Sequence, residues 1–215
     1  MDLQLTDSRV LVTGGTRGIG RAIVEAFAAE GARVEFCARS ADVCATTEAA
    51  VGDQVTGTAV DVGDAAALAG WVEAAAGRLG GIDAVVSNVS ALATGQTEAD
   101  WYASFEVDLM GAVRMVTAAL PHLTESRGSI VAISSVSGRE IDFTAGPYGV
   151  MKAAIVHYVQ GLAYQLLSQI TEVPIANVVD ANYSAVVKAR KSLLPPVAAY
   201  GGLHEDLRAR AATLR

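Results

Sequence analysis

A short apolar run that ends in closely spaced glycines constrains the fold of this chain more than any other stretch. Arg9 to Thr13 is rich in β-branched residues, as in a strand buried on both faces of a parallel sheet, whereas Arg21 to Glu30 carries apolar residues at helical spacing. The turn between them contains Gly14, Gly15, Gly18 and Gly20. Glycine allows positive φ and close approach to an anion, and a helix start presents unpaired N–H groups. The stretch predicts a diphosphate-binding turn; an ordinary tight turn is the alternative.

Strand-like and helix-like segments alternate after this turn. The further strand-like runs are Arg33 to Ala38, Gln54 to Val60, Ala84 to Ser87, Ser129 to Ser134 and Pro174 to Val179. This alternation predicts a doubly wound parallel sheet with helices on both faces, a three-layer α/β/α fold of the Rossmann type. We expect one domain over residues 1–215, and ligands beyond the carboxyl ends of the strands.

Composition excludes several classes of partner. The formal charge is −7, which argues against nucleic acid and anionic membrane as partners. No apolar run reaches membrane length, and Met1 to Ser8 is too short and polar for a signal peptide. We therefore expect a soluble, cytoplasmic protein.

The cysteines and histidines give little support to a disulfide or a metal site. Cys37 lies in an apolar run and Cys44 in a predicted helix, so we expect reduced packing residues, with a disulfide as the alternative. The histidines are isolated from one another and from any cysteine pair: His122, His157 and His204. No metal site is expected.

The spacing of the glycines is specific. Thr13 to Gly20 has the form Thr-Gly-x-x-x-Gly-x-Gly, which resembles the short-chain dehydrogenase/reductase family, and in particular its 3-oxoacyl-[acyl-carrier-protein] reductases. The resemblance covers about Leu3 to Ser168. It implies a hydride transfer between a nicotinamide cofactor and a carbonyl or secondary alcohol. It also implies that the turn binds the cofactor through Gly14, Thr16, Arg17, Gly18, Ile19 and Gly20.

The end of the second predicted strand indicates which cofactor is bound. Folds that prefer NAD usually have an acidic residue here, which binds the ribose hydroxyl and repels a 2′-phosphate. This chain has Ala38 followed by Arg39, and Arg17 adds a second positive charge. The pair favours NADP(H), with two solvated surface arginines as the alternative.

Two further strand ends match cofactor-binding positions of the family. Asp61 and Val62 follow the third strand, where the resemblance implies contact with the adenine; Asp61 as a neighbour of the helix from Asp64 is the alternative. Asn88 follows the fourth strand and matches a family position, although the following Val89-Ser90 departs from the family's Ala-Gly.

The catalytic candidates are Ser135, Tyr148 and Lys152. Ser135 follows the fifth strand, Tyr148 comes thirteen residues later, and Lys152 lies four residues further on, one turn along the same helical face. Tyr-x-x-x-Lys alone is a weak pattern. In this order, after the glycine-rich turn, it matches the family's catalytic set, and the spacing favours Ser135 over Ser134 or Ser137.

The chemistry explains these residue types. Hydride addition to a ketone leaves an alkoxide that must be protonated, and an ordinary phenol with a pKa of about 10 is a weak acid for this task. A nearby ammonium and the positive charge of the oxidised nicotinamide stabilise a tyrosinate; a shift of about three units requires about 4 kcal/mol. Lys152 is placed for that role, and its donors would also hold the nicotinamide ribose, so Tyr148 and Lys152 are expected at the cofactor as well. Ser135 would bind the substrate oxygen.

A long helix is predicted from about Glu98 to Leu123, interrupted at Gly111 and stopped by Pro121. Asp108 stands in it where relatives commonly carry an asparagine, whose main-chain carbonyl holds a water in a proton relay. The resemblance implies that Asp108 keeps this role through its own carbonyl. A carboxylate there would also raise the pKa of a neighbouring acid.

The helix predicted from Pro147 to Ser168 is apolar nearly all round. In the family it pairs with its copy in a neighbouring subunit, so we expect a homodimer or homotetramer; burial within one subunit is the alternative.

The resemblance ends after this helix. Asp180 to Tyr183 replaces the family's Pro-Gly turn, and the segment from about 180 is short and atypical. Two functions follow: an NADP(H)-dependent oxidoreductase with tyrosine as general acid and base, which the intact catalytic set favours, or a catalytically weak or inactive relative that binds dinucleotide or serves as an interaction subunit.

Overall fold

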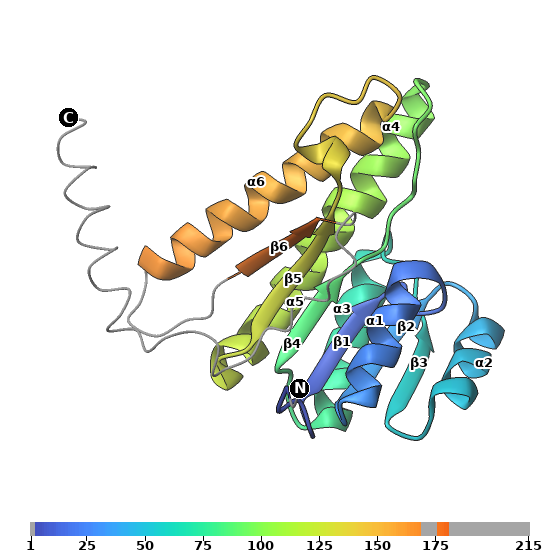
Figure 1. Cartoon of the computed structure of the whole chain (residues 1–215), viewed down its shortest axis with the longest axis vertical. Helices are drawn as coiled ribbons and strands as arrows, with labels where there is room; N and C mark the ends of the chain where they lie inside the picture. The colour runs from blue at the N-terminus through green and yellow to red at the C-terminus, as the bar shows by residue number, and fades with distance from the viewer. Residues whose placement is uncertain (1–2, 169–175, 181–215) are drawn as a thin grey trace.

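The sheet carries the predicted doubly wound topology. The computed structural model describes residues 3–168 and 176–180. Six parallel strands lie in the order β3-β2-β1-β4-β5-β6, so the strand order reverses between β1 and β4, as in the Rossmann fold. They are β1 (Arg9–Thr13), β2 (Arg33–Ala38), β3 (Val55–Ala59), β4 (Ala84–Ser87), β5 (Ser129–Ser134) and β6 (Ala176–Asp180). The expected fold class is confirmed (Figure 1).

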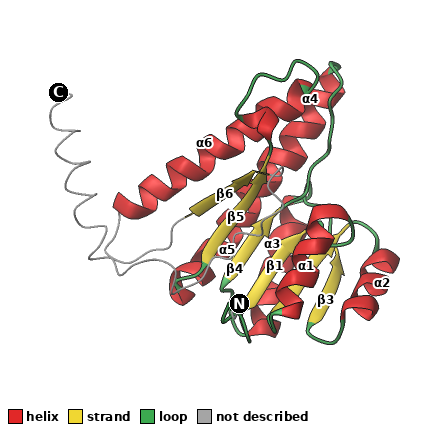
Figure 2. Cartoon of the chain, in the orientation of Figure 1, coloured by secondary structure: helices red, strands yellow, loops and turns green. Residues whose placement is uncertain are grey.

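Helices cover both faces of the sheet (Figure 2). One face packs against α1 (Gly18–Ala29) and α2 (Ala41–Val51), and the other against α3 (Ala65–Leu79), α5 (Gly111–Ser126) and α6 (Gly146–Ser168). Three shorter helical elements complete the secondary structure of the described residues: α4 (Glu98–Ser104), the π-helix η1 (Phe105–Met110) and the 3₁₀ helix η2 (Val136–Gly138).

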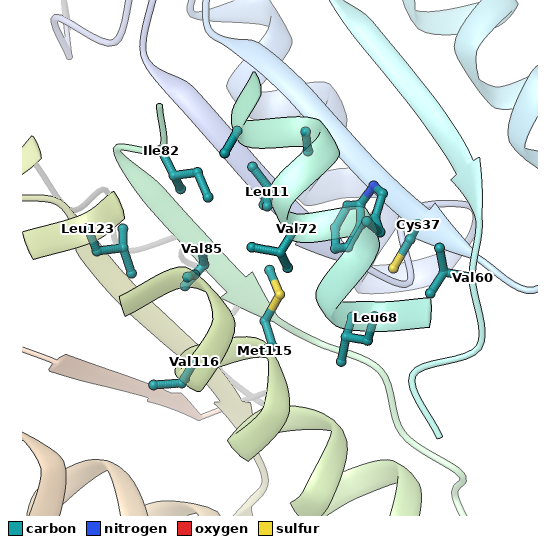
Figure 3. Packing of buried hydrophobic residues seen from close by; sticks show 14 of the residues in the cluster. Leu11, Cys37, Val60, Leu68, Val72, Ile82, Val85, Met115, Val116 and Leu123 are labelled. Atoms are coloured by element: carbon teal, nitrogen blue, oxygen red, sulfur yellow. The ribbon is translucent and has the colours of Figure 1, made fainter. Parts of the chain in front are cut away.

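Alternate residues of the strands feed two separate cores. Val10 and Val12 of β1 point to the α1 side, where they join Ile23 and Phe27. Leu11 points to the opposite side. Figure 3 shows this second core, in which the sheet packs against residues of α3 and α5, labelled Leu68, Val72, Met115, Val116 and Leu123. The strands are therefore buried on both faces, as their apolar sequences predict.

Two ion pairs, of which only the Glu35 carboxylate is fully buried, lie toward the amino-terminal end of the sheet. Glu35 on β2 is 2% exposed, and its carboxylate accepts hydrogen bonds from Nε and Nη2 of Arg78, both at 2.7 Å. Arg9 donates to Asp83 at 2.8 and 2.9 Å. These residues lie at the opposite edge from the predicted site.

The helical stretch predicted from Glu98 to Leu123 is present, but it neither breaks at Gly111 nor stops at Pro121. α4, η1 and α5 follow one another directly, and α5 continues to Ser126, with Arg127 in the left-handed region. The exposed ring of Pro121 removes a single helix hydrogen bond, and the buried Ala119 and Leu123 on either side of it hold the helix in the second core.

Other boundaries differ slightly from those predicted. α1 begins at Gly18, three residues before Arg21, and β6 extends to Asp180. Cys37 and Cys44 are buried free thiols. His204, residues 174 and 175 of the last predicted strand, and the expectation for the chain beyond 180 lie outside the described residues.

Among residues 3–168 and 176–180, no helix is long and apolar enough to cross a bilayer, and no three histidine, cysteine or acidic side chains are grouped so that they could hold a metal ion.

Candidate active site

Many of the predicted site residues directly follow strands, at the carboxyl edge of the sheet. Because all six strands are parallel, their carboxyl ends meet at this edge. The glycine-rich turn follows β1, Asn88 follows β4 and Ser135 follows β5. The turn therefore lies where the strand order reverses, next to β4. The crevice at such a switch point is the usual ligand site of a doubly wound sheet.

The glycine-rich turn needs glycine for two reasons. Gly14 and Gly18 have φ of 76° and 55°, which lie in the left-handed region. A Cβ on Gly20 would collide with the carbonyl oxygen of Gly14 and lie 2.5 Å from Nδ2 of Asn88, and a Cβ on Gly15 would lie 2.6 Å from Phe36. The turn is closed by main-chain hydrogen bonds from Gly14 and Gly15 to the carbonyl of Cys37, at 2.8 and 3.3 Å.

Asn88 holds the turn against β4. Its Nδ2 donates to the carbonyls of Thr13 and Gly14, at 3.0 and 3.4 Å, and its main-chain N–H donates to Oγ1 of Thr13 at 3.0 Å. Val89 N–H reaches the same oxygen at 3.4 Å. The side-chain amide of Asn88 therefore donates its hydrogen bonds to the turn itself, which the sequence alone did not indicate.

The start of α1 is open for an anion. Arg17 precedes the helix in extended backbone and offers no side-chain cap, and the first turn carries no acidic residue. Thr16 is half-buried, and Ile19 is exposed beside it. The first N–H groups of α1 and its positive dipole end therefore face outward with no protein group to satisfy them, a setting that fits a diphosphate.

Both arginines expected at the 2′-phosphate are exposed. Within the described part of the chain, neither Arg17 nor Arg39 forms a hydrogen bond or ion pair through its guanidinium. Other arginines here are paired with carboxylates, including Arg9, Arg21, Arg78 and Arg114. Two unpaired guanidiniums beside a half-buried Ala38 are suited to a phosphate group.

The pair after β3 serves the local backbone. Oδ1 of Asp61 accepts a hydrogen bond from Gly63 N–H at 2.9 Å, and Asp64 caps α3 by accepting from Ala66 and Ala67. Val62 is buried and packs against η1, where a Cβ on Gly111 would lie 3.2 Å from its Cγ2. The hydrogen bond that Asp61 forms in this structure is therefore local and lies just before the start of α3, which is the alternative given for this residue.

The catalytic candidates converge on α6. Tyr148 and Lys152 lie one turn apart, and Nζ of Lys152 is 5.6 Å from the centroid of the Tyr148 ring. Lys152 is 2% exposed, and its Nζ donates to the carbonyl of Ile133 at 3.1 Å. Burial lowers the pKa of Lys152, and the nearby Asp108 opposes this shift. The ammonium is therefore buried beside the phenol, as the spacing predicts.

Ser135 directly follows β5, in extended backbone at the start of η2, and is half-buried. Its Oγ accepts a hydrogen bond from Ser137 N–H at 3.2 Å, which leaves its own hydroxyl proton for a ligand. Ser134 is not equivalent, because it is buried and its hydroxyl donates to the carbonyl of Lys152 at 2.9 Å. A further Cβ on Gly138 would press on the backbone of Lys152, at 2.7 Å, so η2 packs tightly against α6.

Asp108 lies in η1 with its side chain buried against Lys152. Oδ1 of Asp108 is 3.3 Å from Nζ of Lys152, and Oδ2 accepts a hydrogen bond from Ala91 N–H at 3.0 Å. The carboxylate is thus in use, whereas the resemblance implied only its main-chain carbonyl. Ala91 was missed from the sequence because its contribution is a backbone N–H, which no residue type indicates.

The strand order, the glycine-rich turn at the switch point and the serine, tyrosine and lysine at the same edge define a Rossmann-type α/β protein. A model of the short chain dehydrogenase family matches residues 8–179. The chain therefore belongs to the short-chain dehydrogenase family, which confirms the resemblance.

Known proteins agree with this assignment. The chain is similar to isoepoxydon dehydrogenase of Penicillium expansum, with 41% identity over 172 residues, which cover 75% of this chain and 66% of that protein. It is 34% identical over 176 residues to a cis-2,3-dihydrobiphenyl-2,3-diol dehydrogenase of Paraburkholderia xenovorans, covering 76% of this chain and 62% of that protein. The chain thus spans just under two thirds of the length of these curated relatives.

A solved structure shows the same fold. A short-chain dehydrogenase from Streptomyces avermitilis superimposes with a TM-score of 0.74 at 29% identity, covering 80% of this chain and 65% of that one. Like the curated relatives, it extends beyond the part that aligns.

Proposed function

We propose that this protein is an NADP(H)-dependent oxidoreductase that interconverts a carbonyl and a secondary alcohol, with Tyr148 as general acid and base. The observation that carries the proposal is the buried Lys152 ammonium 5.6 Å from the Tyr148 ring, at the same edge of the sheet as the glycine-rich turn. Family membership and the named activities of the relatives support the reaction class.

The turn fits the cofactor that this reaction needs. Gly14 to Gly20 and the open N–H groups of α1 would bind the diphosphate, and Arg17 and Arg39 would bind the 2′-phosphate. When bound, the cofactor supplies the hydride for reduction or accepts it in oxidation. The unpaired state of both arginines is the reason to propose NADP(H) rather than NAD.

The protein's own residues then handle the proton. Ser135 donates a hydrogen bond to the substrate oxygen, which holds the carbonyl in place. As that oxygen becomes an alkoxide, the Tyr148 hydroxyl transfers its proton to it, and the nearby Lys152 ammonium stabilises the tyrosinate that is left. In the oxidation direction the tyrosinate takes the proton back from the alcohol.

Turnover assays test this proposal. We expect NADPH to be consumed with at least one member of a panel of ketones and acyl thioesters, the latter because the turn resembles that of the 3-oxoacyl-[acyl-carrier-protein] reductases. Tyr148→Phe keeps the ring and removes the proton, so it should lose about 10²-fold or more in rate. Full turnover in this variant would contradict the role of Tyr148. NADPH binding without turnover on any substrate would favour the second function, a dinucleotide-binding or interaction subunit.

We also propose that the working form is a homodimer or homotetramer in the cytoplasm. One side of α6 is buried against the sheet, whereas Val150 on its other side is half exposed. Trp101, Tyr102 and Phe105 on α4 and η1 are exposed as well. These apolar side chains are available to a second copy of the chain, and the free thiols suit a reducing compartment. Light scattering at micromolar concentration measures the oligomeric state.

A further inference from the structure

Two opposite charges are buried together beneath the proposed proton donor. Asp108 is 1% exposed and Lys152 is 2% exposed, and their Oδ1 and Nζ atoms are 3.3 Å apart. An unpaired charge in such a place is strongly destabilising, so each residue depends on the other. Lys152 is also the sole lysine among the first 187 residues, whereas arginine supplies the other basic side chains there.

The π-helical turn η1 brings Asp108 to this position. η1 interrupts the α-helical run between α4 and α5, and it packs against α6. Interruptions of this kind are frequent at functional sites. Apart from the ion pair, Oδ1 of Asp108 has no hydrogen-bond partner among the described residues, so the lysine is what compensates this oxygen.

We propose that Asp108 is a positioning residue, whose carboxylate is the counter-ion that keeps Lys152 charged and fixed beside Tyr148. The catalytic consequence rests on the proposed function; the counter-ion role does not. The carbonyl of Ile133 is the other acceptor of the Lys152 ammonium, and it would serve equally well for a neutral amine. Asp108 supplies the negative charge that favours the protonated form.

The same carboxylate links the lysine to the cofactor turn. Oδ2 of Asp108 accepts from Ala91 N–H at 3.0 Å, and Ser104 Oγ donates to the carbonyl of Ala93 at 3.3 Å. Asn88, at the start of this segment, holds the glycine-rich turn through Thr13. The main chain from Asn88 to Ala91 therefore connects the two ends: Asn88 is hydrogen-bonded to the turn that would hold the diphosphate, and Ala91 to the carboxylate that pairs with Lys152.

Other titratable residues lie on α6 and on the elements that pack against it. The further titratable residues on α6 and on the elements packed against it are Tyr148, His157, Tyr158 and Tyr164 on α6, Glu106 on η1, Glu98, Asp100 and Tyr102 on α4, and Asp180 at the end of β6. Glu106 pairs with Arg114 at 2.8 Å, and Asp100 accepts from Thr97. Among the described side chains, Asp108 supplies the carboxylate within ion-pair distance of Lys152.

Titration of Lys152 tests the counter-ion role directly. The chain has three lysines, Lys152, Lys188 and Lys191, so ¹³C-labelled lysine gives three Cε signals, and Lys152→Arg identifies the one of interest. In Asp108→Asn, which keeps the shape and an acceptor for Ala91, we expect the Lys152 signal to titrate at lower pH than in the wild type. Glu106→Gln removes a carboxylate from the same turn and should leave it unchanged. An unchanged midpoint in Asp108→Asn, or an equal shift in both variants, would overturn the proposal.

A second pair of variants covers the case in which Asp108→Asn does not fold. Lys152→Met leaves the Asp108 carboxylate buried without a counter-ion, so adding Asp108→Asn to it should raise the urea midpoint of unfolding. A double variant that is no more stable than Lys152→Met contradicts the pairing.

The pH profile of alcohol oxidation tests the consequence for catalysis. If Lys152 loses its proton without Asp108, it no longer stabilises the tyrosinate, so the rising limb of kcat should move to higher pH in Asp108→Asn. If Lys152 keeps its proton, loss of the negative charge of Asp108 favours the tyrosinate, and the limb moves to lower pH. That result would overturn the proposal. If the wild type neither reduces a carbonyl substrate nor oxidises an alcohol, the proposed function fails, and the lysine titration still decides the role of Asp108.

Discussion

The side chain of Asn88 donates to the main-chain carbonyl of Thr13, and so the residue after β4 fixes the turn after β1. Both strands lie at the point where the strand order reverses. Asn88→Ala removes the side-chain hydrogen bonds to the carbonyls of Thr13 and Gly14, and leaves the part-buried Thr13 carbonyl without this donor. We expect a loss of about 1 to 3 kcal/mol in the free energy of unfolding and at least about tenfold weaker NADPH binding.

Urea unfolding and fluorescence titration with NADPH measure the two effects. Ser90→Ala is the matched control, because within the described part of the chain the Ser90 hydroxyl accepts a hydrogen bond only from Leu92 N–H, in its own loop. NADPH affinity that is unchanged in Asn88→Ala would show that the turn keeps its shape without this side chain.

Gly20→Ala should damage the same turn by a different route. Its new Cβ would collide with the carbonyl of Gly14 and with Nδ2 of Asn88. Overpacking of this kind costs about 1 to 3 kcal/mol, and we expect NADPH binding to be lost with it. Gly70→Ala makes the same substitution on α3, where the Cβ meets nothing within 4 Å, and should stabilise the fold by up to about 1 kcal/mol. Equal effects of the two substitutions would contradict the crowding at Gly20.

Local sequence patterns predicted much of this fold, because each strand and turn has its own signal. Spacing alone predicts the glycine-rich turn, the doubly wound parallel sheet and the position of Lys152 one turn after Tyr148. Pro121 shows where local signals fail: its preference for ending a helix is overridden by the buried residues on either side.

The side-chain contacts within the site could not be predicted in the same way. The contact between Asp108 and Lys152 joins residues 44 positions apart, and the contact between Asn88 and Thr13 joins residues 75 apart. Such pairs depend on the register of η1 against α6 and of β4 against β1, which periodicity does not determine. Asp108 was predicted by position, yet its partners emerge only from the packing of the elements.

Arg39 should discriminate between the two nicotinamide cofactors. A charge-assisted hydrogen bond contributes about 1.5 to 3 kcal/mol, so Arg39→Ala should raise the Kd for NADPH by about tenfold or more and leave the Kd for NADH unchanged. Arg21→Ala, whose guanidinium pairs with Glu25, is the control and should change neither value. Equal affinity for NADH and NADPH that Arg39→Ala does not alter would refute the preference for NADP(H).

Arg78→Met should destabilise the amino-terminal edge of the sheet. It leaves the Glu35 carboxylate buried without its two hydrogen bonds. Breaking a buried pair costs about 3 to 5 kcal/mol, but Arg78 is 47% exposed and water can reach the site, so we expect about 2 to 3 kcal/mol. Adding Glu35→Gln removes the stranded charge and should recover part of the loss. Additive losses in the double variant would show that the two side chains are not coupled.

The two buried thiols should make the fold sensitive to alkali. Burial raises the pKa of Cys37 to about 12 and also raises the pKa of Cys44. An unfolded thiol ionises near pH 8.5, so between about pH 9 and about pH 12 the unfolded chain binds fewer protons than the folded one, and stability falls as pH rises. Cys37 alone should account for a loss of about 1.4 kcal/mol per pH unit in this range.

Unfolding in urea at about pH 8 and about pH 10, in the wild type and in Cys37→Ala, measures this slope as a difference between the two proteins. The wild type should lose more stability than Cys37→Ala over the interval, because the variant has no thiolate to gain at this position on unfolding. A thiol reagent should correspondingly label Cys37 only as fast as the chain opens, since the buried thiol is neither ionised nor accessible. Equal slopes in the two proteins, or rapid labelling of Cys37 in the native state, would contradict the burial that raises its pKa.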